Sequence, residues 1–503
     1  MQWQAAALAA GEIAQGWTRE GGPGGAILLF DADDIRAEAC GGLASLELDL
    51  PFRADTAVRF ASISKHFLCG LLATDGHIGF DDALGAHLPL PPALGAVTVG
   101  RALDMTGGLP DAMETLWLLG VPPTATLDRH ALLRFVSSLE ATNFAPGTEI
   151  SYSNTGYRLV QAALEAKGID YAAALHERFF RPLGLSIRFP EDETDIVPAL
   201  ATGYWHGPRG WQRGRYGLHF SASGGLAGSA LDLTAWAQAL MSRRGPADGL
   251  LARLGARRHL ADGRATEYGL GLARSPVPGL IALGHGGSLP GYKNHFLFAP
   301  EYKAGVVVLS NREDTDAHGV ALRVMAALAG TTLTEPTPAL PDGRFLAEDG
   351  PFWLEHQGGT ATFLGAQETL YPGEGGFAEG RSAHLPMRLR LAGGVIEGEI
   401  GHVARRFHPV PDGLSASGAW AGHWVCAAQN ARFDIAVSAG VARLAIGAGP
   451  LYMELELTPL GPDMALMERG GDGPWRQRTC LQFSGNTVRL VTNRSRILVF
   501  ERG

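Results

Sequence analysis

Three short motifs constrain this chain more than any other feature of its sequence. They are residues 62–65 (SISK), residues 152–154 (YSN) and residues 285–287 (HGG). On a helix, residues three apart are neighbours, so the hydroxyl of Ser62 and the amine of Lys65 would lie side by side. A Lys that is partly desolvated can act as a base toward such a hydroxyl. Together the motifs predict an acyl-transfer site in which Ser62 is the nucleophile.

The second and third motifs supply the other groups that this chemistry needs. In an extended segment Tyr152 and Asn154 point to the same side, and we expect Tyr152 to shuttle a proton to the leaving amine. The amide of Asn154 suits a substrate amide because it both donates and accepts hydrogen bonds. His285 is followed by Gly286 and Gly287, which would let a substrate lie against the backbone of a strand.

An oxyanion hole is expected beside the nucleophile. Its two donors would be the backbone N–H of Ser62 and that of a residue just after the third motif, for which Ser288 is the candidate. Losing one such donor typically lowers the rate by ~10²–10³.

Each of these residues also has an ordinary structural interpretation. Ser62 is a favourable cap for the helix that we expect over residues 62–74, and Tyr152, Asn154 and His285 are common core, turn and strand residues. Lys65 is different, because the residues after it are apolar and a buried ammonium is costly unless it has a partner. The catalytic interpretation therefore depends on the three motifs occurring together.

The motif order resembles that of the penicillin-binding protein and β-lactamase superfamily, whose pattern is S-x-x-K, then S-D-N or Y-x-N, then K-T-G. The chain departs from this pattern at His285, which stands where the superfamily has Lys. Other stretches that fit are 22–25 (GPGG) before an apolar first strand, 146–147 (PG), and 224–229 (GGLAGS) before a helix. The resemblance implies an α+β fold, with an antiparallel sheet flanked by helices.

The length of the chain predicts several domains. It has 503 residues, and about 150 residues per domain suggests about three. Residues 331–341 (TTLTEPTPALP) form a candidate linker, after which short alternating strands replace helical periodicity. We therefore predict a β-lactamase-like catalytic domain over 1–332 and two small antiparallel β-barrels over 340–415 and 416–503.

Charge, cysteine content and apolar runs exclude several classes of function. A net charge of −9 without a basic cluster argues against nucleic-acid and anionic-membrane partners. The sequence has no metal-binding motif, and we expect no cofactor. The first residues lack the basic region of a signal peptide, and no apolar run approaches ~18 residues, so a cytoplasmic protein is expected. The cysteines are expected to be reduced core thiols; they are Cys40, Cys69, Cys426 and Cys480.

Within the superfamily, the Y-x-N and H-x-G motifs and the two β domains resemble the bacterial D-aminopeptidases. This resemblance implies hydrolysis of N-terminal D-residues from short peptides, amides and esters, a homodimer, and inhibition by β-lactams. In that family a loop from the last domain enters the cleft and supplies an Asp for the free amine of the substrate. Residues 467–475 (MERGGDGPW) resemble this loop, which would make Asp472 the amine ligand. An ordinary hairpin tip is the alternative.

Two other functions stay open at this point. The first is a D,D-carboxypeptidase, an esterase or a β-lactamase on the same catalytic domain. A carboxypeptidase needs a cation for the free C-terminal carboxylate, and His285 in place of Lys weakens that case. The second is a non-enzymatic sensor, which the intact Ser62, Lys65 and Tyr152 disfavour.

Overall fold

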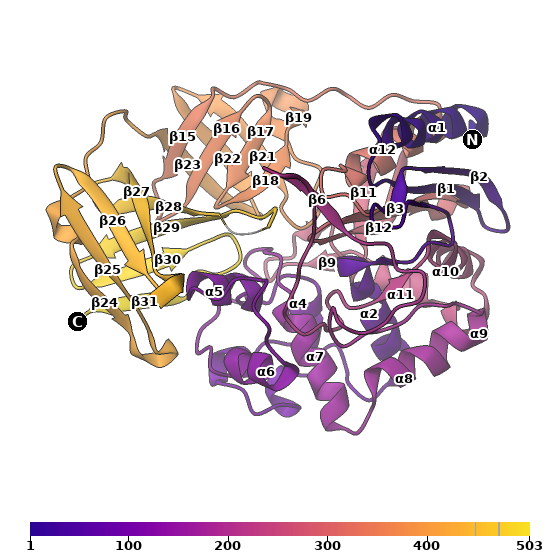
Figure 1. Ribbon diagram of the computed structural model, residues 1–503, viewed down its shortest axis with the longest axis horizontal. Helices are drawn as coiled ribbons and strands as arrows, with labels where there is room; N and C mark the ends of the chain where they lie inside the picture. Colours follow the sequence, from indigo (N-terminus) through magenta and orange to yellow (C-terminus); the bar gives the residue numbers. More distant parts are fainter. Residues whose placement is uncertain (448, 471–472) are drawn as a thin grey trace.

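The computed structural model describes residues 1–447, 449–470 and 473–503. A helix-rich part built around a six-stranded sheet is followed by two parts made almost wholly of β-strands (Figure 1). Within the described ranges, none of the helices combines the length and the apolar content that a membrane crossing requires.

The six-stranded sheet is antiparallel and joins the start of the chain to residues 273–310. Its strand order is β11-β12-β13-β14-β1-β2. The central strands β1 and β14 are apolar along nearly their whole length and buried on both faces, because helices cover both sides of the sheet. The strands are β1 (Gly25–Asp31), β2 (Ile35–Gly41), β11 (Ala273–Val277), β12 (Leu280–Leu289), β13 (Tyr292–Ala299) and β14 (Ala304–Ser310).

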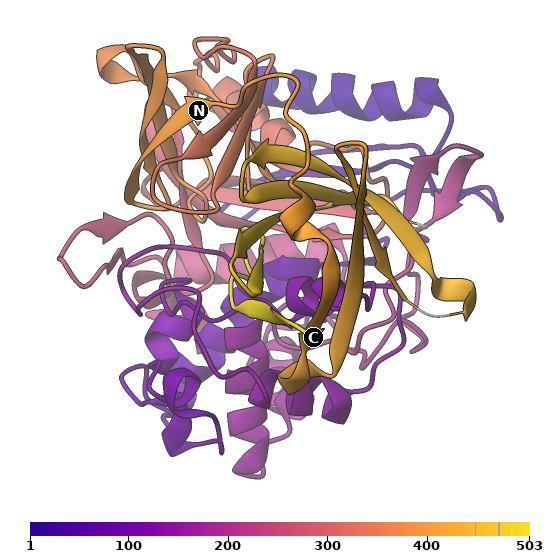
Figure 2. The ribbon, with the colours of Figure 1, turned by 90° about the vertical axis from the view of Figure 1, so that its left-hand side faces the viewer.

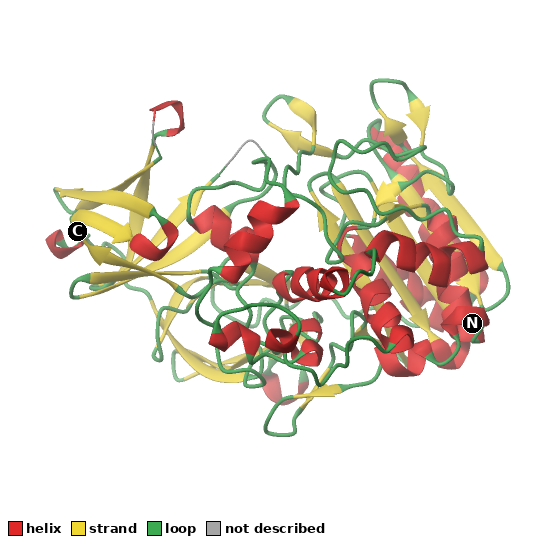
Figure 3. Cartoon of the chain, turned by 90° about the horizontal axis from the view of Figure 1, so that it is seen from below, coloured by secondary structure: helices red, strands yellow, loops and turns green. Residues whose placement is uncertain are grey.

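Alternate residues of these strands enter two separate cores. Ile27 and Val308 pair across β1 and β14 and pack against α1 (Trp3–Glu20) and α12 (Ala317–Ala329). Their neighbours on the opposite face, such as Leu28, join the larger core beneath the remaining helices. Figure 3 shows this layering, with helices on both faces of the sheet. Successive side chains of each strand point to opposite faces of the sheet, so they contribute to the two cores in turn.

The remaining helices of this part form the layer that carries the candidate site. They are α2 (Lys65–Asp75), α3 (Pro92–Gly95), α4 (Val99–Leu103), α5 (Ala112–Leu118), α6 (Arg129–Ser137), α7 (Thr155–Ala166), α8 (Tyr171–Leu175), α9 (Arg181–Leu183), α10 (Ala230–Ser242) and α11 (Leu250–Leu254). Short strand pairs link them: β3 (Leu43–Ser45), β4 (Leu50–Pro51), β5 (Val58–Arg59), β6 (Tyr204–Gly207), β7 (Gly210–Arg213), β8 (Ala227–Gly228), β9 (Arg258–His259) and β10 (Ala265–Thr266).

The first β-rich part is a nine-stranded antiparallel sheet of barrel-like form. Its strand order is β18-β17-β16-β15-β23-β22-β21-β20-β19, around a core that includes Trp353 and Phe407. The strands are β15 (Gly343–Ala347), β16 (Trp353–Gln357), β17 (Thr360–Phe363), β18 (Ala366–Thr369), β19 (Tyr371–Pro372), β20 (Ala378–Glu379), β21 (Met387–Ala392), β22 (Val395–Ile400) and β23 (Val403–Pro409).

The second β-rich part is a closed eight-stranded barrel, in which β24 pairs with β31. Trp420 stacks on Phe483 inside it, with ring centroids 4.8 Å apart. The strands are β24 (Gly422–Cys426), β25 (Ala431–Ser438), β26 (Val441–Ile446), β27 (Met453–Gly461), β28 (Met464–Arg469), β29 (Gln477–Ser484), β30 (Thr487–Val491) and β31 (Leu498–Arg502). The predicted fold class is confirmed. The domain bounds 1–332, 340–415 and 416–503 remain our proposal.

The closed barrel packs against the helical layer (Figure 2). The β30–β31 loop, residues 492–497, makes this contact: the hydroxyls of Ser495 and Thr115 lie 2.8 Å apart. The guanidinium of Arg496 binds both oxygens of Glu149, at 2.9 and 2.7 Å, and both side chains are buried. The barrel is thereby fixed close to the segment that leads into Tyr152.

Candidate active site

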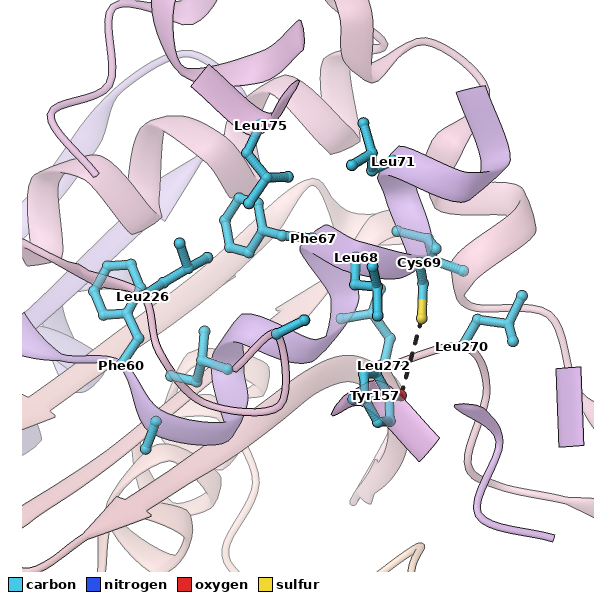
Figure 4. Close-up of a cluster of buried hydrophobic side chains, with 14 of the residues drawn as sticks. Phe60, Phe67, Leu68, Cys69, Leu71, Tyr157, Leu175, Leu226, Leu270 and Leu272 are labelled. Carbon is cyan, nitrogen blue, oxygen red and sulfur yellow. Dashed lines mark hydrogen bonds between the residues drawn. The ribbon is translucent and has the colours of Figure 1, made fainter. Parts of the chain in front are cut away.

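The turn that presents Ser62 is held by tight packing on both sides. Residues 61–64 form a 3₁₀ turn that runs directly into α2, where the sequence predicts one helix from Ser62. Ala61 has a φ of 52°, which is unusual for a residue with a side chain, so the turn is strained. The buried ring of Phe60 precedes the turn and that of Phe67 follows it in α2, and both belong to the larger core (Figure 4). Because residues i and i+3 eclipse in a 3₁₀ turn, Ser62 and Lys65 lie on one face.

Lys65 is fully buried and contacts three oxygens. Its Nζ lies 2.8 Å from Asn154 Oδ1, 2.7 Å from the carbonyl oxygen of Ser223 and 3.0 Å from Ser62 Oγ. A neutral amine has two N–H groups and one lone pair. The amide and carbonyl oxygens accept the two N–H groups, so the lone pair is left to face the hydroxyl of Ser62, which can donate. This arrangement would allow Lys65 to act as a base toward the hydroxyl of Ser62.

The electrostatics of Lys65 favour its neutral form. Burial holds the pKa of Lys65 well below its usual value of 10.5, and the carboxylate of Asp111 partly opposes this shift. The guanidinium of Arg494 adds to the lowering of this pKa by charge repulsion. A buried ammonium would carry a large desolvation cost, so the proton is easily lost.

Asn154 is clamped by a carboxylate that sequence reasoning missed. Asp111 Oδ2 accepts hydrogen bonds from the backbone N–H of Asn154 at 2.8 Å and from its Nδ2 at 2.9 Å. Asp111 is fully buried and also caps α5, where its Oδ1 accepts from the backbone N–H of Glu114 at 3.1 Å. From the sequence it has only the features of a helix cap. In the structure it orients the amide that holds Lys65.

Tyr152 lies between the amine of Lys65 and the guanidinium of Arg494. Lys65 Nζ lies 4.7 Å from its ring centroid, and Arg494 Cζ also lies 4.7 Å from that centroid. Burial raises the pKa of Tyr152, while its contact with Ser62 and the charge of Arg494 act in the opposite direction. The phenol therefore stays protonated and can donate its proton.

His285 is a neutral residue with both ring nitrogens engaged. Its Nδ1 contacts the carbonyl oxygen of Gly286, which can only accept, so Nδ1 donates. Its Nε2 then accepts from the hydroxyl of Tyr268 at 2.8 Å. Burial is the main cause that holds the pKa of His285 well below its usual value, and repulsion from Lys65 adds to it. The residue therefore supplies no positive charge where the superfamily pattern has Lys.

The strand after His285 lies against the nucleophile turn. A Cβ atom on Gly287 would lie 2.0 Å from the carbonyl oxygen of Phe60, so only glycine fits there. Ser288 follows with its side chain exposed, and its Oγ accepts a hydrogen bond from Lys293 at 2.8 Å. The expected role of the N–H groups of Ser62 and Ser288 as oxyanion donors stays a prediction.

Two side chains from the β-rich parts also reach Tyr152, and the sequence did not predict either. The ring of His384, between β20 and β21, lies 4.8 Å from that of Tyr152, and Arg494 comes from the β30–β31 loop. Burial lowers the pKa of His384 to about 3. No spacing in the sequence signals these residues, because they belong to loops far along the chain from the motifs.

Asp472, the predicted amine ligand, lies outside the described residues. The strands before and after its loop are β28 and β29. Arg469, at the end of β28, donates to the carbonyl oxygens of Trp117 and Gly120 at 3.4 Å each, so this hairpin contacts the end of α5. Across residues 1–447, 449–470 and 473–503, no group of three or more His, Cys, Asp or Glu side chains is arranged to hold a metal ion.

Several known proteins are similar to this chain in sequence or in structure. A D-aminopeptidase from Cereibacter sphaeroides is 28% identical over 478 residues, which is 90% of each chain. The octameric penicillin-binding protein homologue from Pyrococcus abyssi has a TM-score of 0.57 at 18% identity and covers 99% of each chain. A D-amino acid amidase from Ochrobactrum anthropi SV3 has a TM-score of 0.54 at 22% identity, over 65% of this chain and 99% of that one.

The family itself follows from the first two thirds of the chain. Residues 9–331 match the family described as Beta-lactamase, and this segment contains the Ser62–Lys65 turn, Tyr152, Asn154 and His285. The six-stranded sheet with helices on both faces is the fold that the superfamily resemblance implies. The chain belongs to the Beta-lactamase family.

Proposed function

We propose that this protein is a serine hydrolase that releases N-terminal D-amino acids from short peptides, amides and esters through an acyl-enzyme. The observation that carries the proposal is the placement of Lys65, whose two N–H groups have acceptors while its lone pair faces Ser62 Oγ at 3.0 Å. The D-aminopeptidase name of the Cereibacter sphaeroides relative supports the choice of substrate, as does the D-amino acid amidase of similar fold.

Acylation would begin with attack of Ser62 Oγ on the carbonyl carbon of the substrate. The hydroxyl proton passes to the neutral amine of Lys65, while the oxyanion accepts hydrogen bonds from the N–H groups of Ser62 and Ser288. The C–N bond then breaks, and the leaving amine takes a proton from the phenol of Tyr152. The proton on Lys65 restores that phenol, so the acyl-enzyme forms with the amine base regenerated.

Deacylation would use the same groups in reverse. A water molecule gives a proton through Tyr152 to Lys65 as its oxygen attacks the ester carbonyl, and the oxyanion is again held by the two N–H groups. Collapse of the intermediate breaks the bond to Ser62 Oγ, which takes back a proton from Lys65. The products are the free D-amino acid and the unmodified enzyme.

Asp472 is our proposed ligand for the α-ammonium of the substrate. A charged amine in a cleft needs a carboxylate partner, and a charge-assisted hydrogen bond of this kind contributes roughly 1.5–3 kcal/mol. Asp472→Ala is expected to lower kcat/KM about 10- to 100-fold for free-amine substrates relative to their N-acetylated forms. An equal effect on both substrate types would assign the residue to an ordinary hairpin. A homodimer, a cytoplasmic location and inhibition by β-lactams are further parts of the proposal.

One assay tests the proposed function directly. We expect the protein to hydrolyse D-alanyl p-nitroanilide and to leave L-alanyl p-nitroanilide nearly untouched, and Ser62→Ala to abolish turnover. Mass spectrometry after exposure to a β-lactam should place a covalent adduct on Ser62. Preference for the L-substrate, or an adduct on a different residue, would contradict the proposal. Cleavage of N-acylated peptides only would favour a carboxypeptidase instead.

A further inference from the structure

Arg494 is a cation that the closed barrel delivers to the proton-donating tyrosine. Its guanidinium carbon lies 4.7 Å from the ring centroid of Tyr152, although the two residues belong to different parts of the fold. The side chain is 26% exposed, so it is partly accessible to solvent. The mechanism proposed above gives it no task.

The backbone around Arg494 is firmly fixed. Its N–H donates to Glu114 Oε2 at 3.1 Å, and its carbonyl oxygen accepts from the backbone N–H of Asp111 at 2.8 Å. That carbonyl also accepts from Asn143 Nδ2 at 2.9 Å. The loop therefore holds its position through main-chain contacts, and a substitution of the Arg494 side chain leaves these contacts in place.

Within the described residues, the guanidinium of Arg494 has N–H groups that no protein acceptor binds. Its one charged partner is Glu114, with Nε and Oε1 3.6 Å apart, which is too long for a good hydrogen bond. In the part of the chain that the structure describes, neither terminal amino group of Arg494 donates to a protein acceptor. Burial raises the pKa of Glu114, while the charge of Arg494 acts in the opposite direction. Two parallel N–H groups beside Tyr152 are left to meet a ligand.

We propose that Arg494 binds the free carboxylate of the amino acid that leaves on acylation, so that short peptides ending in a carboxylate, above all dipeptides, are preferred over the matching amides. This inference rests on the proposed function for the identity of the acyl residue. Beyond that function, the inference specifies that the leaving group carries a free carboxylate.

The chemistry of a leaving amino acid supports this assignment. Tyr152 gives its proton to the leaving amine, and in an α-amino acid the carboxylate is attached to the same carbon as that amine. A cation held against the Tyr152 ring is therefore well placed to meet this carboxylate. The planar fork of a guanidinium matches a carboxylate in two-point contact, which an ammonium cannot do.

The test compares two substrates that differ only in the charge of the leaving group. These are D-phenylalanyl-glycine and D-phenylalanyl-glycinamide, whose scissile bonds are the same. For Arg494→Met, the ratio of kcat/KM for the acid to that for the amide should fall about 10- to 100-fold, as expected for loss of a charge-assisted pair. For Arg494→Lys, which keeps the positive charge but lacks the planar guanidinium, the same ratio should fall less. Because both rates come from the same variant, a loss of stability cancels in the ratio.

A matched control and the opposite outcomes keep the test decisive. Arg443→Met removes an exposed guanidinium from β26, whose partner is Glu456 at 3.5 Å, and should leave the ratio unchanged. An equal loss on both substrates in Arg494→Met would show that the residue only adjusts the charge around Lys65 and Tyr152, and an unchanged ratio would overturn the inference outright. If the wild type cleaves only N-acetylated peptides, the proposed function fails, and the same ratio on the N-acetylated pair still decides the role of Arg494.

Discussion

At the scale of single residues, the surroundings of Lys65 favour its neutral form. Asn154 and Ser223 accept two of its N–H groups, so the lone pair of a neutral amine would face Ser62 Oγ, and burial, which lowers the pKa of Lys65, favours that neutral form. The charged and titratable groups around it act in both directions: Asp111 raises its pKa, whereas Arg494 lowers it. Its other polar neighbours stay neutral, because burial raises the pKa of Cys69 to about 12 and lowers that of His285.

Asp111 is expected to set the acid limb of the activity profile. Removing its charge in Asp111→Asn takes away the attraction that raises the Lys65 pKa, so this pKa falls further. The amine is then neutral at lower pH, and the acid limb of kcat/KM should move to lower pH. The rate at the plateau should also drop about 10- to 100-fold, since Asn154 loses a charged acceptor.

The pH dependence of kcat/KM measures this effect. Asp128→Asn is the matched control, because Asp128 caps α6 in the same way, accepting from the backbone N–H of Ala131 at 2.8 Å. Asp128→Asn should leave the acid limb of the kcat/KM profile at the same pH. A shift of the limb to higher pH in Asp111→Asn would contradict the charge assignment.

At the scale of elements, the close contact between β12 and the 3₁₀ turn decides the shape of the site. The two segments approach so closely at Gly287 that a Cβ would overlap the carbonyl oxygen of Phe60. The nearest atoms are the carbonyl oxygen and carbon of Phe60, which belong to the main chain, so rotation of a side chain cannot relieve the overlap. The glycine is therefore needed for contact between strand and turn, whatever its part in substrate binding.

Gly287→Ala is expected to displace the nucleophile turn. The overlap should lower the unfolding free energy by about 1–3 kcal/mol, as overpacking does, and reduce kcat much more than it raises KM. Thermal unfolding and steady-state kinetics check both parts. Gly11→Ala in α1 is the control, because a Cβ there meets nothing within 4 Å and should stabilise the helix by about 0.5–1 kcal/mol. Wild-type kinetics in Gly287→Ala would contradict the prediction, because they would show that β12 can shift without displacing Ser62.

At the scale of the whole molecule, the helical part and the β-rich parts share one buried charge cluster. Glu149 binds Arg496 of the closed barrel in two-point contact, and Arg405 of the nine-stranded sheet lies 3.9 Å from it. All three side chains are buried. The cluster therefore ties the three parts together next to Tyr152.

Arg496→Met is expected to weaken this junction. Removing one partner of a buried pair typically costs about 3–5 kcal/mol, and the lower end applies here because Arg405 stays near Glu149. Chemical denaturation measures the loss, and the double variant Glu149→Met/Arg496→Met should recover most of it, since no buried charge is then left unpaired. A double variant as unstable as Arg496→Met would show that packing, rather than charge, explains the cost.

The sequence alone determined the proposed catalytic pattern, because this pattern depends on spacing between residues that are close along the chain. The spacing of three positions from Ser62 to Lys65 places hydroxyl and amine on one face in a 3₁₀ turn as in an α-helix, and the apolar residues around them predict burial. The α+β fold and the two antiparallel β structures also follow from periodicity and from the family pattern. These properties depend on residues close together along the chain or on a fixed motif order.

Only the tertiary structure decided which other groups complete the site. Asp111 has the sequence signature of a helix cap, and His384 and Arg494 lie in loops without periodicity, yet all three converge around Tyr152, Asn154 and Lys65. The neutral state of His285 likewise depends on burial and on Tyr268, which no spacing reveals. Local pattern fixes which side chains share a face, whereas contacts between distant loops and the desolvation that they impose arise only when the sheets and helices pack.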